Sequence, residues 1–152
     1  MITKCNWGET AQCYVDLHDR ECFMVGKIIW SDNQWFLLQC ISPTAHWDGF
    51  ALISQAELHR LEINSDYCRH LADVLAMRHE AEILPPIIKA NPLYEMLDYA
   101  VDKKIPIALE LCRSATNDVI GRIVSYDQNV VHVQQFDDDG KPNGESWIDP
   151  KK

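Results

Sequence analysis

The stretch VGKIIWSD at residues 25–32 decides the fold, because it returns as IGRIVSYD at residues 120–127. The offset between the two glycines is 121 − 26 = 95, and the same offset relates Gly49 to Gly144. Self-similarity at a fixed spacing is typical of a chain built from repeated structural units. We therefore expect two small β modules of one type, with a different kind of segment between them.

Each copy reads as a series of short strands joined by tight turns. Residues 35–41 are dense in strand-forming side chains, and the polar residues Asp32 and Asn33 before them indicate a hairpin tip. Residues 58–63 indicate a fifth short strand, for which the second copy has no counterpart before Lys152. Five short strands joined by tight turns form a small barrel or a sandwich. We expect the second barrel to lack its last strand and to leave a sheet edge open.

The segment between the copies has a helical pattern. Asn64 or Ser65 can cap a helix with apolar residues on one face, and the proline pair at 85–86 would stop it. An Asn-Pro step then starts a second helix over residues 93–102.

The predicted fold class is mainly β with helices (α+β), in three parts. Residues 1–64 form the first β module, and residues 65–90 form a helix and a proline-containing linker. Residues 91–152 form the second module, in which a helix precedes about four strands.

The composition points to a globular protein of a reducing compartment. No apolar run reaches the roughly 18 residues that a membrane helix needs, and residues 1–7 lack the apolar core of a secretory signal. The six cysteines include no CxxC pair, so we expect free thiols. The expected location is the cytoplasm.

The charge balance bears on the class of partner. The chain has 23 Asp and Glu residues against 14 Lys and Arg, a formal net charge of −9. Nucleic-acid-binding proteins usually carry a basic surface, because neutralising phosphates supplies much of their affinity. The acidity weighs against RNA, DNA and anionic membranes, and RNA binding would need a local basic patch.

The glycine-to-aspartate spacing carries a family resemblance. Gly26 stands six residues before Asp32, and Gly121 stands six residues before Asp127. A helix followed by strongly bent strands with this spacing resembles the Sm-like (Lsm) fold. Two such modules in one chain resemble a group of uncharacterised bacterial proteins with Sm-like modules in tandem. The resemblance implies a binding or assembly role and association by pairing of edge strands.

Two departures from the Sm pattern concern RNA. RNA-binding Sm proteins carry an asparagine four residues after the tip aspartate, where this chain has Phe36 and Val131. The Arg-Gly step that completes their RNA pocket is replaced by Ser54–Gln55 and Asp149–Pro150. The resemblance therefore supports the fold more than it supports RNA binding.

Motifs for catalysis and for cofactors are weak in this sequence. The acidic loop at 137–140 does not follow the ligand spacing of a calcium loop, because lysine and proline interrupt it. The histidines form no close-set pair of the kind that zinc requires. No glycine-rich phosphate-binding motif is present. We expect no enzyme activity, no cofactor and no metal.

Aromatic and polar residues of the first module form the candidate binding face, since exposed aromatic side chains can stack on bases or hold peptides. The candidate residues are Trp30, Asp32, Asn33, Trp35, His46 and Trp47. An alternative reading makes residues 46–49 a turn, with Trp47 capping the barrel. The residues that define the repeat have a structural role in this prediction: Gly26, Asp32, Gly49, Gly121, Asp127 and Gly144.

The leading functional prediction is a non-catalytic binding or assembly protein that acts through protein–protein contacts. Self-association through the open sheet edge is part of this hypothesis. An RNA-binding tandem Sm-like protein is the first alternative, and an enzyme whose site residues converge only in space is the second.

Overall fold

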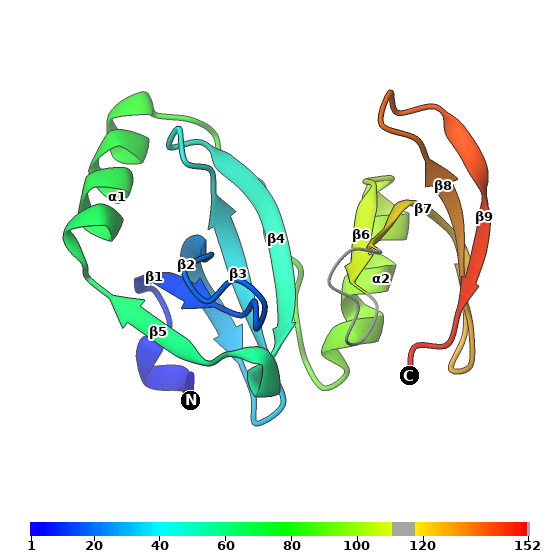
Figure 1. Ribbon diagram of the computed structural model, residues 1–152, viewed down its shortest axis with the longest axis horizontal. Helices are drawn as coiled ribbons and strands as arrows, with labels where there is room; N and C mark the ends of the chain where they lie inside the picture. Colours follow the sequence, from blue (N-terminus) through cyan, green and yellow to red (C-terminus); the bar gives the residue numbers. More distant parts are fainter. Residues whose placement is uncertain (111–117, 152) are drawn as a thin grey trace. The chain divides into compact units, whose positions relative to one another are not determined.

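The computed structural model describes residues 1–110 and 118–151, and the chain divides into two compact units, residues 1–88 and 89–152 (Figure 1). Alternation predicts a strand over residues 105–111, and the next predicted strand begins at Asn117. Leu111, Asn117 and the predicted free thiol of Cys112 lie outside the described residues. Each unit contains one antiparallel sheet and one α-helix.

The first unit contains a five-stranded sheet in the order β4-β3-β2-β1-β5. Its elements are the short 3₁₀ helix η1 (Lys4–Asn6), β1 (Thr10–Tyr14), β2 (Met24–Ser31), β3 (Trp35–Ile41), β4 (Trp47–Ser54), the 3₁₀ helix η2 (Gln55–Glu57), β5 (Arg60–Ile63) and α1 (Asp66–Arg78).

The second unit contains a four-stranded sheet in the order β6-β7-β8-β9. Its elements are α2 (Pro92–Lys103), β6 (Ile107–Glu110), β7 (Asp118–Tyr126), β8 (Val131–Phe136) and β9 (Pro142–Ile148). The predicted class, mainly β with helices, is confirmed, with two antiparallel sheets of five and four strands. Closed barrels and Sm-like modules remain predictions.

The offset of 95 residues also relates the cross-strand partners of the two sheets. Gly26 pairs with Cys40 in the first sheet, and Gly121 pairs with Gln135 in the second. The register shift after Ile28 in β2 recurs after Ile123 in β7, at the equivalent place. The β2–β3 pair and the β7–β8 pair therefore share their register and its irregularity as well as a sequence pattern.

The repeated glycines make close strand contacts possible. A Cβ atom at Gly26 would lie 2.4 Å from the Gln39 carbonyl oxygen, and one at Gly121 would lie 2.0 Å from the Gln134 carbonyl oxygen. Both distances are far below van der Waals contact, so only glycine allows the neighbouring strand to approach this closely.

The first sheet is packed on both faces. One face carries Ile28, Phe36 and Leu38, which form a core with Ile2 and Leu58. The other face carries Val25 and Ile41, which α1 covers. The second core also includes Ala45, Leu71 and Leu75, with Phe23, Trp47 and Val74 at its margin.

The second sheet has one core, on the side where α2 packs. Leu97 of α2 contacts Val119, Val131 and Val133, all of which are buried. Val131 and Val133 are the counterparts of Phe36 and Leu38, because 131 − 95 = 36 and 133 − 95 = 38. The helix of the second unit therefore covers the face that corresponds to the Phe36 side of the first sheet.

The predicted helix starts agree with the structure, but the predicted end of the first helix does not. Ser65 caps α1, and its hydroxyl oxygen accepts a hydrogen bond from the Cys68 backbone N–H. The helix ends at Arg78, before the prolines, because His79 adopts a left-handed conformation with φ of 50°. The chain thus leaves the helix axis before the prolines, and Glu80 contacts His46 of the β3–β4 loop.

Alternation predicts a first strand that reaches Leu17, and the sequence predicts a loop over residues 43–49, but both boundaries differ in the structure. β1 ends at Tyr14, because the Asp16 carboxylate accepts hydrogen bonds from the next turn and leaves Leu17 exposed. β4 starts at Trp47 and includes Gly49, whose φ of 77° is favourable only for glycine. The predicted loop is therefore shorter and the strand longer.

Candidate functional site

The six residues of the predicted binding face lie at two opposite ends of the first sheet. Trp35 pairs with Ser54 at one end of β3 and β4, whereas Ile41 pairs with Trp47 at the other end. A seven-residue strand such as β3 extends over roughly 20 Å. The group around Trp30, Asp32, Asn33 and Trp35 therefore does not form one surface with His46 and Trp47.

The first group surrounds the β2–β3 turn. Asp32 Oδ1 accepts hydrogen bonds from the backbone N–H groups of Gln34 and Trp35, at 2.8 and 2.7 Å. Asp127 accepts the equivalent two bonds in the second unit, at 2.7 and 3.0 Å. These carboxylates stabilise their turns, which is the structural role predicted for the repeated aspartates.

A hollow of about 340 Å³ lies beside the β2–β3 turn. The amide nitrogen of Gln55, in its wall, already donates hydrogen bonds to the carbonyl oxygens of Ile2 and Asp32, at 2.7 and 3.1 Å. The hollow is lined by Asn33, Gln34, Trp35, Ser54, Gln55 and Ala56. Its side chains are neutral and include no nucleophile–base pair. The hollow therefore has a structural role and is not a candidate catalytic site.

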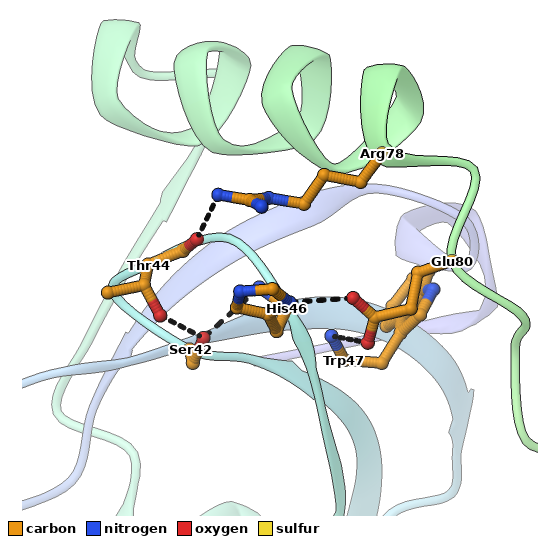
Figure 2. A network of polar contacts seen from close by, with 6 residues as sticks. All are labelled: Ser42, Thr44, His46, Trp47, Arg78 and Glu80. Carbon is orange, nitrogen blue, oxygen red and sulfur yellow. Dashed lines mark hydrogen bonds and ion pairs between the residues drawn. The ribbon is translucent and has the colours of Figure 1, made fainter.

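The second group belongs to a network that attaches the β3–β4 loop to the end of α1 (Figure 2). His46 Nδ1 lies 2.7 Å from Glu80 Oε2, and the Trp47 backbone N–H donates to Glu80 Oε1 at 3.2 Å. Arg78 donates to the Thr44 carbonyl oxygen at 3.1 Å. The hydrogen bond with His46 lowers the pKa of the Glu80 carboxyl, and the Trp47 N–H acts in the same direction.

The network contains serine, histidine and glutamate, but its hydrogen bonds hold the β3–β4 loop against the end of α1. We name this network the brace. Ser42 Oγ accepts a hydrogen bond from the His46 backbone N–H at 3.1 Å, while the imidazole is turned to Glu80 (Figure 2). A nucleophilic serine needs its hydroxyl hydrogen-bonded to the imidazole. Trp47 packs at the margin of the core under α1. Both observations favour the alternative reading of residues 46–49 as a structural turn.

Burial makes two of the described cysteines, Cys13 and Cys40, unreactive as nucleophiles. Burial raises the pKa of Cys13 and of Cys40 to about 12, which keeps both thiols protonated at neutral pH. The free cysteines among the described residues are Cys5, Cys13, Cys22, Cys40 and Cys68.

Within residues 1–110 and 118–151, no three metal-binding side chains gather at one point. No helix in that part of the chain is long and apolar enough to cross a membrane.

The second sheet carries a surface that is not among the candidates predicted from the sequence. Alternation along the strands places one set of residues on the face opposite Val119, Val131 and Val133. Cross-strand pairing joins Arg122 to Gln134 and His132 to Trp147 on that face. We name these residues the outer face: Ile120, Arg122, His132, Gln134, Phe136, Glu145 and Trp147.

Apolar and aromatic side chains of the outer face are open to solvent. Ile120 is 51% exposed and Trp147 is 63% exposed. The Trp147 ring stacks on His132, with centroids 4.5 Å apart, and His132 Nε2 lies 3.0 Å from Glu145 Oε1. The stacking and the hydrogen bond orient the exposed indole before any partner arrives, which lowers the entropy cost of binding.

The equivalent positions of the first unit show that the solvent exposure of the outer face is unusual. Ile120 corresponds to Val25, since 120 − 95 = 25, and Phe136 corresponds to Ile41. Val25 and Ile41 are only 7% and 6% exposed, because α1 packs on them. The same face is thus covered by a helix in the first unit, whereas in the second unit Ile120 is open to solvent.

A sequence signal for the outer face exists, although it is ambiguous. Residues 119–124 include apolar side chains on both alternations, Val119 and Ile123 on one and Ile120 and Val124 on the other. That pattern is typical of a strand covered on both faces. Which of the two faces stays open depends on where the helices pack, and this information is not local to the strand.

Comparison with protein-family models, with curated proteins and with solved structures returns no match to this chain.

Proposed function

We propose that this protein acts as a non-catalytic binding protein and that the outer face of its second sheet contacts another protein. One observation carries the proposal: Ile120 is exposed at a position whose counterpart, Val25, is buried under a helix. Exposed aromatic and apolar side chains on a regular sheet are characteristic of protein interaction surfaces. Trp147 is the kind of residue that supplies much of the binding energy at such surfaces.

The proposal favours a protein over RNA. The two positions where RNA-binding Sm proteins carry asparagine are Phe36 and Val131, which are 0% and 2% exposed. Neither side chain can reach a base without unfolding its core. The sheet region around the outer face is also acidic, which opposes contact with phosphates. A pair of Sm-like modules without the RNA site remains our proposal for the fold family.

A second candidate function, self-association, is favoured by the edge strand β6. In the described residues β6 pairs only with β7, whereas its counterpart β1 pairs with both β2 and β5. The edge strand of a sheet can accept a strand from a second copy of the chain. Sedimentation equilibrium would detect a dimer at micromolar concentration. A purely monomeric protein at high concentration would contradict this candidate.

The test of the proposed function uses a photo-crosslinking residue at the outer face. Trp147→p-benzoylphenylalanine places the crosslinker in the candidate contact, and Met77→p-benzoylphenylalanine places it at a 77% exposed control position on α1. We expect a protein adduct from position 147 that protease removes and ribonuclease does not. The adduct should disappear when Ile120→Asp is added to the same chain. Adducts of equal yield from both positions, or an adduct with RNA, would contradict the proposal.

A further inference from the structure

The first unit shows which kind of element fits this face. There, α1 covers the counterparts of Ile120 and Phe136 with Leu71 and Leu75, which lie four residues apart on one helix face. Apolar residues at this spacing form the stripe of an amphipathic helix. Because the β2–β3 and β7–β8 pairs share their register and its shift, a helix suits the outer face of the second sheet for the same geometric reason.

The dimensions of the outer face agree with a short helix. Ile120 and Phe136 lie toward one end of the sheet, and His132 and Trp147 lie toward the other. Five residues of strand separate the level of Ile120 from that of Ser125, which pairs with His132, a distance of about 16 Å. A helix of about 11 residues spans the same distance. Two apolar contact points, one at each end, would anchor such a helix.

The charges around the outer face indicate which residues should flank the apolar stripe of a helix bound there. Between residues 118 and 151 there are seven acidic side chains and three basic ones, 3 − 7 = −4. The acidic residues lie mainly at the strand ends: Asp118, Asp127, Asp137, Asp138, Asp139, Glu145 and Asp149. The basic residues are Arg122, Lys141 and Lys151, and the Arg122 guanidinium lies over the Phe136 ring, 5.9 Å from its centroid.

From these observations we propose that the partner of the outer face is an amphipathic helix with lysine or arginine beside its apolar stripe, supplied by another protein. This inference rests on the proposed function, which requires only that some protein binds there. A second copy of the chain is a poorer occupant, because its net charge of −9 would be added to an acidic surface. Complementary charge favours the basic helix and opposes acidic competitors.

The experiment titrates the full chain, labelled with ¹⁵N, with three synthetic 16-residue peptides. The first has leucines at helical spacing and lysines elsewhere. In the second every lysine is replaced by glutamate, and the third is a scrambled version of the first that cannot form an apolar stripe. The readouts are the indole N–H signal of Trp147 and the backbone amide signal of Ile120.

We expect the basic amphipathic peptide to shift both signals in a saturable way, with an affinity that falls as salt screens the charges. The other two peptides should bind about tenfold more weakly or not at all, and Trp147→Ala should weaken the first peptide by about tenfold. Met77→Ala, an exposed change on α1, is the matched control and should leave the affinity unchanged. Equal binding of the basic and acidic peptides, or shifts confined to other surfaces, would overturn the inference.

The result can be separated from that of the crosslinking experiment. A protein adduct at position 147 without binding of the basic peptide would overturn the helix inference and leave the proposed function standing. Absence of both would overturn both. If the adduct contains a second copy of this chain, the face serves self-association and the basic-helix inference is wrong.

Discussion

The two sheets of this protein share a strand pattern but differ in what covers them. In the first unit, Phe36 and Val25 lie on opposite faces of the sheet and both are buried. In the second unit, Val131, the counterpart of Phe36, is buried, whereas Ile120, the counterpart of Val25, is half exposed. The difference arises from the helices, because α1 packs on the Val25 face of its sheet and α2 packs on the Val131 face of the other.

This contrast separates the part of the repeat that maintains the fold from the part that is free to acquire a function. The register of the central strand pair, the two tip aspartates and the two strand glycines are the same in both units. The outer face is where the units diverge, and it changes from an apolar core in one to a mixed aromatic and polar surface in the other. We interpret that divergence as the mark of a binding surface.

The largest predicted loss of stability comes from substituting the strand glycines that both sheets share. Gly26→Val and Gly121→Val each force a side chain into a carbonyl oxygen of the neighbouring strand, so each should destabilise its own unit by about 3 kcal/mol or more. Differential scanning calorimetry combined with hydrogen exchange of each unit measures the loss. An unchanged melting curve for both variants would show that the close strand contact is wrong.

A smaller effect distinguishes the sheets at equivalent positions. Val25→Ala removes a buried side chain beneath α1 and should cost about 2 kcal/mol. Ile120→Ala removes a larger side chain, but one that is 51% exposed, and should cost about 0.5 kcal/mol or less. Chemical denaturation of the two variants gives both values. Equal losses would mean that the outer face is covered in solution, which would remove the contrast between the units.

The smallest stability effect tests the brace that holds the β3–β4 loop to α1. Hydrogen bonding to His46 lowers the pKa of Glu80 in the folded chain, so ionised Glu80 stabilises the fold above its unfolded pKa of about 4.3. That stabilisation is lost as the pH falls through the lower folded pKa. Glu80→Gln should therefore melt below the wild type at pH 7, and the difference should shrink toward pH 3.

The control for this brace is Glu82→Gln, which changes the same charge two residues away in the chain. It should leave the pH dependence of the melting temperature close to that of the wild type. A Glu80→Gln variant that keeps the wild-type profile would mean that the Glu80–His46 contact does not stabilise the loop in solution.

Local patterns in the sequence predict much of this fold. The offset of 95 residues predicts two similar sheets, and Ser65 predicts the start of α1, because capping and alternation act over a few residues. The end of α1 was mispredicted, since His79 leaves the helix in a left-handed conformation where no glycine or proline stands.

The candidate site was less predictable than the fold. Trp30 and Trp47 were grouped by residue type, but β3 separates them, and Trp47 packs at the margin of a core. The outer face could not be recognised from sequence, because Ile120 and Val25 look alike until the position of each helix is known. Long-range packing, which the local pattern does not encode, decides which apolar side chains remain exposed.

Hydroxyl-radical footprinting of the isolated protein, with oxidation quantified at single residues, tests the central claim most directly. Trp147 and Ile120 should be oxidised at rates close to those of the unfolded chain, whereas Val25 and Trp47 should be protected. Dilution of the protein should change neither the oxidation rate of Trp147 nor that of Ile120. Protection of Trp147 and Ile120 in the isolated protein would contradict the account, because the outer face would then already be covered.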